Sequence, residues 1–92
     1  MPAIKATVVV KHQHGLHARP ADLFVRKANE FQSSIEVGNV SRASRRVNAK
    51  SILGILSLGV HSGDSIEISA DGLDGAAAVD ALSTLVNGNF GE

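Results

Sequence analysis

The sequence contains no cysteine, tryptophan or tyrosine, and its only aromatic residues are three phenylalanines. The missing cysteine excludes disulfide bonds and thiolate metal sites, and it fits a reducing compartment. Single-stranded nucleic-acid binders stack bases on aromatic side chains, and nucleic-acid binders in general carry an excess of basic residues. Here nine basic residues balance nine acidic ones. We therefore expect no nucleic-acid partner.

Long apolar runs are also missing. No stretch approaches the roughly 20 apolar residues of a membrane-spanning helix, and Lys5 and Lys11 interrupt the early run that a secretory signal would need. Hydrophobic residues nevertheless make up 43% of the 92 positions, which indicates a folded core. We expect a soluble, cytoplasmic protein without membrane insertion that folds as one domain over residues 1–92. Because the sequence lacks a second large apolar patch, we expect a monomer.

Four segments alternate between apolar and polar residues, which is the period of a β-strand with one buried face. They are enriched in β-branched residues, as strands are. The segments are 4–11, 34–40, 46–49 and 64–70. The residues expected to face the core are Ile4, Ala6, Val8, Val10, Ile35, Val37, Val47, Ala49, Ile66, Ile68 and Ala70.

Between the strands, apolar residues recur at helical spacing. A first helix is expected to begin at residue 17 or 18 and to continue to 31. A short second helix covers 52–58, with Ser51 as its N-cap and Gly59 just past its end. The last helix follows Asp74, which can cap it. The residues of this helix expected to face the core are Ala78, Val79, Leu82 and Leu85.

The predicted order of elements is therefore βαββαβα. Four strands whose hydrophobic face is covered by helices on one side make a two-layer α+β domain. The short helix 52–58 is apolar on almost every side, and two helical turns cannot bury all of these residues. We expect Ile55 and Leu58 to join the core and part of the helix to form an exposed apolar patch.

Candidate chemistry is concentrated in the segment 15–20, Gly-Leu-His-Ala-Arg-Pro. Gly15 permits an unusual backbone turn, and Pro20 fits only the first turn of a helix. His17 therefore stands at the start of a helix whose first N–H groups have no partner inside the helix. An anion on its ring would meet these donors, beginning at Ala18, and the guanidinium of Arg19.

A phosphoryl group is the anion that suits this arrangement. Neutral imidazole is a nucleophile near pH 7, and the phosphoramidate that it forms stays reactive enough to pass the group onward. Arg19 can stabilise charge on the transferring group without being consumed. The residues alone leave open an ordinary solvated histidine beside a helix cap.

Residues 15–21, GLHARPA, resemble the active-site signature of the HPr family, the histidine-containing phosphocarriers of the bacterial sugar phosphotransferase system. The similarity continues in 48–59, NAKSILGILSLG, and in 63–70. It covers essentially the whole chain in the same order of elements. The resemblance implies an open-faced β-sandwich, with three helices on one face of a four-stranded antiparallel sheet.

By the same resemblance, His17 accepts phosphate on Nδ1 from phosphorylated enzyme I and donates it to the A-type domains of sugar permeases. Arg19 assists both transfers. The chain would then be a carrier rather than an enzyme, and it would need no cofactor or metal.

The resemblance also assigns roles around the second helix. Ser51 matches a serine that a dedicated ATP-dependent kinase, the HPr kinase/phosphorylase, phosphorylates in many bacteria. Ile52, Leu53 and Leu56 match the partner-facing residues of the helix, and Arg26 matches a basic position that helps to dock acidic partners. The alternative is that Ser51 is only a helix cap and that these apolar side chains belong to the core.

Two features are not covered by these family motifs. The stretch 36–48 is about three residues longer than usual and contributes Arg42, Arg45 and Arg46, which we interpret as a solvated hairpin tip or as an extra basic contact for an acidic partner. His61, just past Gly59, is expected to have a surface role or a role at the helix end.

The spacing His12-x-His14-x-x-His17 could suggest a metal cluster. Because the chain has no cysteine and two of the three histidines lie on a loop, we expect no metal site.

Three alternative functions remain open at this point. Residues 85–92 resemble tails of proteobacterial members that include a nitrogen-related branch, so the carrier could serve regulation rather than sugar uptake. A module that is never phosphorylated could instead bind partners through the patch of Ile52 to Leu56. A hydrolase is disfavoured because no second acid or base accompanies His17.

Overall fold

The computed structural model describes residues 3–92 and contains, over that range, four β-strands, three α-helices and two short 3₁₀ helices. In chain order the elements are β1 (Ile4–Val9), α1 (Ala18–Ala28), β2 (Ser34–Asn39), η1 (Val40–Arg42), β3 (Val47–Asn48), α2 (Ile52–Ser57), β4 (Ser65–Asp71), α3 (Gly75–Asn87) and η2 (Asn89–Gly91). The predicted order βαββαβα is confirmed, with the 3₁₀ turns added to it.

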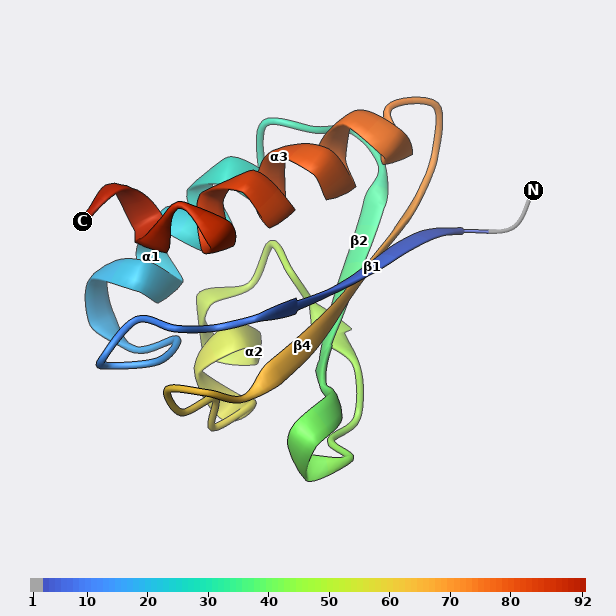
Figure 1. Ribbon diagram of the computed structural model, residues 1–92. Helices are drawn as coiled ribbons and strands as arrows, with labels where there is room; N and C mark the ends of the chain where they lie inside the picture. Colours follow the sequence, from blue (N-terminus) through green and yellow to red (C-terminus); the bar gives the residue numbers. More distant parts are fainter. Residues whose placement is uncertain (1–2) are drawn as a thin grey trace.

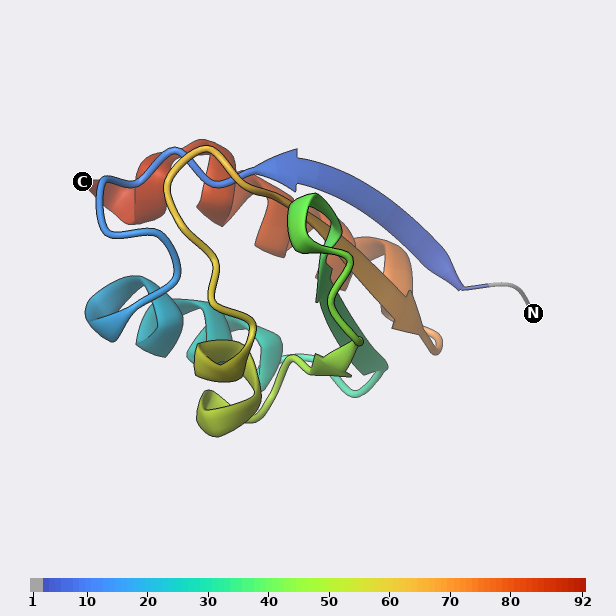
Figure 2. The same cartoon turned by 90° about the horizontal axis from the view of Figure 1, so that it is seen from below.

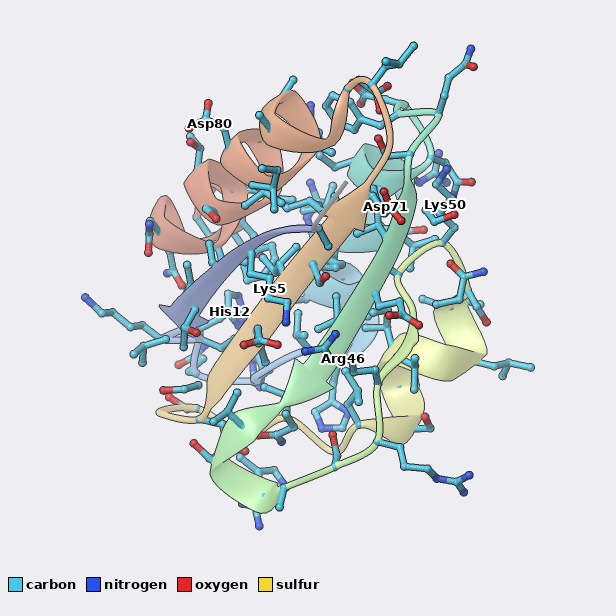
Figure 3. The ribbon with its side chains drawn as sticks, turned by 90° about the vertical axis from the view of Figure 1, so that its right-hand side faces the viewer. Lys5, His12, Arg46, Lys50, Asp71 and Asp80 are labelled. Atoms are coloured by element: carbon cyan, nitrogen blue, oxygen red, sulfur yellow. The ribbon has the colours of Figure 1, made fainter. Side chains whose placement is uncertain are left out.

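The strands form one antiparallel sheet in the order β1-β4-β2-β3. The inner strand β4 pairs Ala70 with both Ile4 of β1 and Ile35 of β2. The α-helices pack against one face of the sheet (Figure 1), and a view from the right of Figure 1 has the strands in front of the helices (Figure 3). Seen from below, the strands occupy the right of the view, with α1 and α2 on the left (Figure 2). This is the two-layer, open-faced arrangement expected from the sequence.

The core lies between the sheet and the helices. Its largest fully buried apolar side chains are Leu16, Phe24, Ile35, Ile55, Ile66, Ile68 and Leu82. Each contributes about 1.5–3 kcal/mol by leaving water. Within residues 3–92 no α-helix covers the other face of the sheet, which presents polar side chains such as Lys5 and Arg46 (Figure 3).

Ile4 differs most from the predicted core, and Ala6, Val47 and Leu85 are only partly buried against it. Ile4 is 46% exposed because the amino end of the edge strand β1 extends beyond the helices (Figure 1). Leu85 is only partly buried, and its neighbour Val86 takes the buried position on α3. Alternation along a strand identifies the face that a residue is on, but not how far along the strand the helices reach.

The predicted cap of α3 is wrong in one respect. Asp74 occupies the N-cap position but makes no side-chain hydrogen bond to its own helix. Its carboxylate instead accepts the backbone N–H groups of Gln32 and Ser33 at 2.8 and 2.9 Å, together with the Ser33 hydroxyl. These hydrogen bonds, above all the one from the Ser33 hydroxyl, lower the pKa of Asp74. The carboxylate therefore joins the loop after α1 to the start of α3.

Candidate functional site

The loop before α1 is shaped by Gly15. Its φ of 61° is left-handed, and a Cβ at this position would lie 2.1 Å from the carbonyl oxygen of Val60. The Gly15 N–H donates to the His12 carbonyl at 2.8 Å, and the Leu16 N–H donates to the Val60 carbonyl at 3.1 Å. Leu16 itself is fully buried. The turn predicted at Gly15 is therefore present, and it attaches the site to the segment just before β4.

His17 is the N-cap residue of α1, with an extended backbone (φ −117°, ψ 159°) and no side-chain capping bond. Its ring is exposed. The next residue, Ala18, is the first of the helix and has a φ of 48°, which is unusual for a residue with a Cβ. Such strain costs about 1–3 kcal/mol and is common at functional sites. The expected helix start at 17 or 18 is confirmed.

The first turn of α1 offers positive partial charge beside the imidazole. The N–H groups of Ala18 and Arg19 precede the first bond of the helix and have no carbonyl partner within it. Pro20, which has no N–H, lies buried in the same turn. The Arg19 side chain is exposed, and within residues 3–92 it forms no ion pair. Arg19 is therefore available to an incoming anion.

A second histidine lies next to His17. The ring centroids of His17 and His61 are 6.3 Å apart, with the ring planes tilted by 33°. Sequence reasoning assigned His61 only a surface or helix-end role, because the bond between Leu16 and Val60 that joins the two segments leaves no pattern in the sequence. No local signal could have identified this neighbour of the site.

His61 is in turn bound to the segment between β2 and β3. Nη2 of Arg42, the last residue of η1, lies 2.5 Å from Nδ1 of His61. Nε of Arg42 donates to the Asp64 carboxylate at 2.9 Å, and the His61 backbone N–H donates to the same oxygen at 3.0 Å. The backbone N–H of His61, the Asn39 amide and Arg42 lower the pKa of Asp64 to about 2. Asp64 is therefore a carboxylate over the whole physiological range.

The other arginines of the segment 36–48 differ from Arg42 in their contacts. Arg46 donates to Glu67 at 2.5 Å and lies 3.9 Å from Glu36, on the open face of the sheet (Figure 3). Arg45 is exposed. Two arginines of this segment, which was predicted as a solvated hairpin tip or a partner contact, are therefore in ion pairs. Arg46 pairs with residues of the sheet, and Arg42 pairs with Asp64 in the turn before β4.

Ser51 is the N-cap of α2, as predicted, because its Oγ accepts the Gly54 N–H at 3.1 Å. The apolar residues of α2 separate as expected from the sequence. Ile55 and the C-cap Leu58 are buried, at 0% and 4% exposure. The residues of the exposed apolar patch are Ile52, Leu53 and Leu56, with exposures of 41%, 76% and 38%.

Two further positions singled out from the sequence are Arg26 and His12. Arg26, in the last turn of α1, is exposed and bonded through Nε to Asp22 at 2.9 Å. His12 is buried, and its Nε2 lies 3.2 Å from a carboxylate oxygen of Glu92. Residues 3–92 contain no group of three or more His, Cys, Asp or Glu placed to hold a metal ion. Over the same range, no helix has the length and apolar character needed to cross a membrane.

Comparison with known proteins identifies the family. A family model described as the PTS HPr component phosphorylation site matches residues 4–88. The chain is 39% identical over 89 residues to the phosphocarrier protein HPr of Neisseria meningitidis serogroup A, covering 97% of each. It is 40% identical over 87 residues to the multiphosphoryl transfer protein of Vibrio cholerae, covering 95% of this chain but only 22% of that protein.

Comparison of the fold with solved structures identifies the same family. The crystal structure of HPr-C-His from Thermoanaerobacter tengcongensis matches with a TM-score of 0.91 and 46% identity, covering 97% of each chain. The chain therefore belongs to the HPr family, the phosphocarrier proteins of the phosphotransferase system.

Proposed function

We propose that His17 of this chain carries the phosphoryl group, receiving it from phosphorylated enzyme I and passing it to A-type domains of sugar permeases. In the first transfer a ring nitrogen of His17 attacks phosphorus and an N–P bond forms. The bond from phosphorus to the donor breaks, and the donor keeps the electron pair. The second transfer repeats these events at the acceptor, so the chain is a stoichiometric intermediate.

One observation carries this proposal: an exposed imidazole stands at the N-terminus of an 11-residue helix, within the region that matches the phosphorylation-site family model. The helix end stabilises a nearby anion by about 0.3–1 kcal/mol. A charge-assisted hydrogen bond from Arg19 adds about 1.5–3 kcal/mol. Together these contributions favour the phosphorylated state while leaving it reactive.

Phosphorylation from phosphoenolpyruvate tests the proposal. The protein is incubated with enzyme I and phosphoenolpyruvate, and intact mass is measured before and after acid treatment. We expect one added phosphate that is labile in acid and stable in alkali. It should be lost in His17→Ala and retained in His14→Ala, which removes an exposed histidine of the same loop. Unchanged labelling of His17→Ala would reject His17 as the acceptor.

The acceptor is identified in a second step. Purified A-type permease domains, or regulators of the nitrogen-related branch, are added to the phosphorylated protein, and loss of its phosphate is followed by mass. Rapid transfer to the permease domains supports the sugar branch. Transfer only to the regulators would reject the sugar branch and assign the carrier to the nitrogen-related branch.

Ser51 is the proposed site of regulatory phosphorylation. It begins α2 beside the exposed patch, and phosphorylation would add about −1.5 to −2 charge there at pH 7. Charge of that size would repel an acidic surface of enzyme I. With the HPr kinase/phosphorylase and ATP, we expect an acid-stable phosphate that is lost in Ser51→Ala. Ser57→Ala, at the other end of α2, is the matched control and should still be labelled.

Partner docking is proposed for the patch of Ile52, Leu53 and Leu56, with the basic Arg26 of α1 contacting acidic partners. Exposed apolar residues of this kind mark interaction surfaces. The same patch supports the alternative of a binding module that is never phosphorylated. Such a module would bind partners but take up no phosphate in either phosphorylation assay.

A further inference from the structure

The contacts of His61 fix which of its nitrogens carries the proton. A guanidinium has N–H donors but no acceptor, so the Nδ1 atom that lies 2.5 Å from Arg42 must be the acceptor of that hydrogen bond. A neutral ring that accepts at Nδ1 carries its proton at Nε2. His61 is therefore held as a hydrogen-bond donor through Nε2–H. The same arrangement makes His61 a poor nucleophile, since one nitrogen is occupied by Arg42 and the other is protonated.

Arg42 is itself held in place by Asp64, which is only 13% exposed at its side chain. The Asp64 carboxylate accepts from Arg42, from the His61 backbone and from the Asn39 amide. Asn39 is fully buried and also donates to the Leu58 carbonyl at 3.3 Å. The chain of contacts from the buried Asn39 to the exposed His61 is thus continuous. It gives the imidazole a fixed orientation beside His17.

This arrangement depends on the segment between β2 and β3. Arg42 ends the 3₁₀ helix η1 and is followed by Ala43 in a left-handed conformation with a φ of 51°, which turns the chain back toward β3. The Ser44 hydroxyl accepts the Asn39 N–H at 2.8 Å and closes the base of the turn. The turn at η1 therefore brings a guanidinium to the second histidine of the site.

We propose that His61 is a second catalytic residue of the phosphoryl site, donating a hydrogen bond from Nε2–H to the phosphoryl oxygens on His17, and that Arg42 is its positioning residue. This inference rests on the proposed function of His17. The two exposed rings lie with their centroids 6.3 Å apart. A phosphoryl group on a ring nitrogen of His17 lies in the plane of that ring, and on the side of His61 it meets the Nε2–H donor in addition to Arg19 and the helix end. Hydrogen bonds to charged groups are stronger than neutral ones.

Phosphate exchange between the wild type and a variant measures this contribution directly. Phosphorylated wild-type protein is mixed with an equal amount of ¹⁵N-labelled variant and catalytic enzyme I, without phosphoenolpyruvate, and exchange proceeds to equilibrium. Intact mass at alkaline pH then reports how the phosphate is divided. We expect His61→Ala to hold about tenfold less phosphate than the wild type, as for loss of one hydrogen bond to a charged group. His61→Gln, which keeps an N–H donor, should recover part of the difference.

The matched control is His14→Ala, because His14 is another exposed histidine near the site and lies against His12 rather than His17. It should divide phosphate equally with the wild type. Equal division with His61→Ala would overturn the role of His61 while leaving the carrier function intact. If the wild-type protein takes up no phosphate at all, the proposed function and this inference both fail.

Two further measurements test Arg42. Nitrogen-15 chemical shifts of the His61 ring report its tautomer, which should be Nε2–H in the wild type and a mixture in Arg42→Ala. Arg42→Ala should also hold less phosphate, and the double variant with His61→Ala should be no worse than His61→Ala alone. Additive losses, or a wild-type ring protonated at Nδ1, would contradict a positioning role for Arg42.

Discussion

Gly15 and Gly59 have nearly the same left-handed backbone, with φ of 61° and 59°, but different surroundings. A Cβ on Gly15 would lie 2.1 Å from the Val60 carbonyl oxygen, whereas one on Gly59 would meet no atom within 4 Å. We expect Gly59→Ala to lower the free energy of unfolding by about 1–2 kcal/mol, the cost of this conformation for a residue with a Cβ. Gly15→Ala should lose about 1–3 kcal/mol more through overlap. Urea unfolding measures both, and equal losses would contradict the contact with Val60.

Asp64 makes the stability of the fold depend on pH. Its pKa is lowered from the ordinary 3.8 to about 2, first by the His61 backbone N–H and next by the Asn39 amide. Because the folded state binds this proton less readily than the unfolded state, the carboxylate stabilises the fold above about pH 4. The contribution is lost as pH falls through about 2.

Thermal unfolding at a series of pH values tests this dependence. Between pH 4 and 2 the wild type should lose stability more steeply than Asp64→Asn, which has no proton to gain at this position. Asp80→Asn, on the exposed side of α3, is the control and should follow the wild type. Parallel curves for the wild type and Asp64→Asn would show that the carboxylate contributes nothing.

Within α2, we expect the stability of the fold and the docking of partners to depend on different residues. Ile55 is fully buried and Leu53 is 76% exposed, although both belong to the same helix. Ile55→Ala should lower the free energy of unfolding by about 2–5 kcal/mol. Leu53→Ala should change it by less than about 0.5 kcal/mol, yet raise the KM for phosphorylation by enzyme I at least about fivefold, the effect of a residue worth about 1 kcal/mol in an interface. An unchanged KM would exclude Leu53 from the docking surface.

Periodicity was enough to predict the elements but not all of their ends. The alternation in 34–40 and 64–70 identified β2 and β4 because both strands bury one whole face. The helix predicted to reach residue 31 instead ends at Ala28. Its C-cap Asn29 donates from its side chain to Val25 at 2.9 Å and to the Lys50 carbonyl at 3.4 Å. The second contact comes from a distant segment, which helical spacing cannot reveal.

The part of the site that the sequence predicts is the part made of residues that are close together in the chain. His17 and Arg19 are close together in the sequence. A glycine, a proline and the apolar spacing of the helix were therefore sufficient to predict that both lie at its start. His61 and Arg42 reach the same place only because the loop at Leu16 pairs with Val60 and η1 folds back on Asp64. Long-range pairing of this kind depends on the complete sheet. The sequence alone therefore predicts only a solvated hairpin tip or a partner contact for Arg42, and a surface or helix-end role for His61.

The loop that carries His17 is also held from the far end of the chain. His12 is buried at 4% exposure, and its ring meets the edge of Phe90, also 4% exposed, at a centroid distance of 6.0 Å. Its Nε2 lies 3.2 Å from the Glu92 carboxylate, whose side chain is 45% exposed. Burial of the phenylalanine should stabilise the loop more than the contact with Glu92 does, since a hydrogen bond contributes only about 0.5–1.5 kcal/mol net.

Two substitutions separate these contributions. Phe90→Ala should lower the free energy of unfolding by about 3–5 kcal/mol, because it removes a buried aromatic ring from the core. Glu92→Gln keeps an oxygen facing His12 and should cost less than about 1 kcal/mol. Hydrogen exchange adds a local readout: the His14 N–H, which donates to Nδ1 of His12 at 3.1 Å, should exchange faster in Phe90→Ala than in Glu92→Gln. If Glu92→Gln were the more damaging substitution by both measurements, charge rather than packing would hold the loop in place.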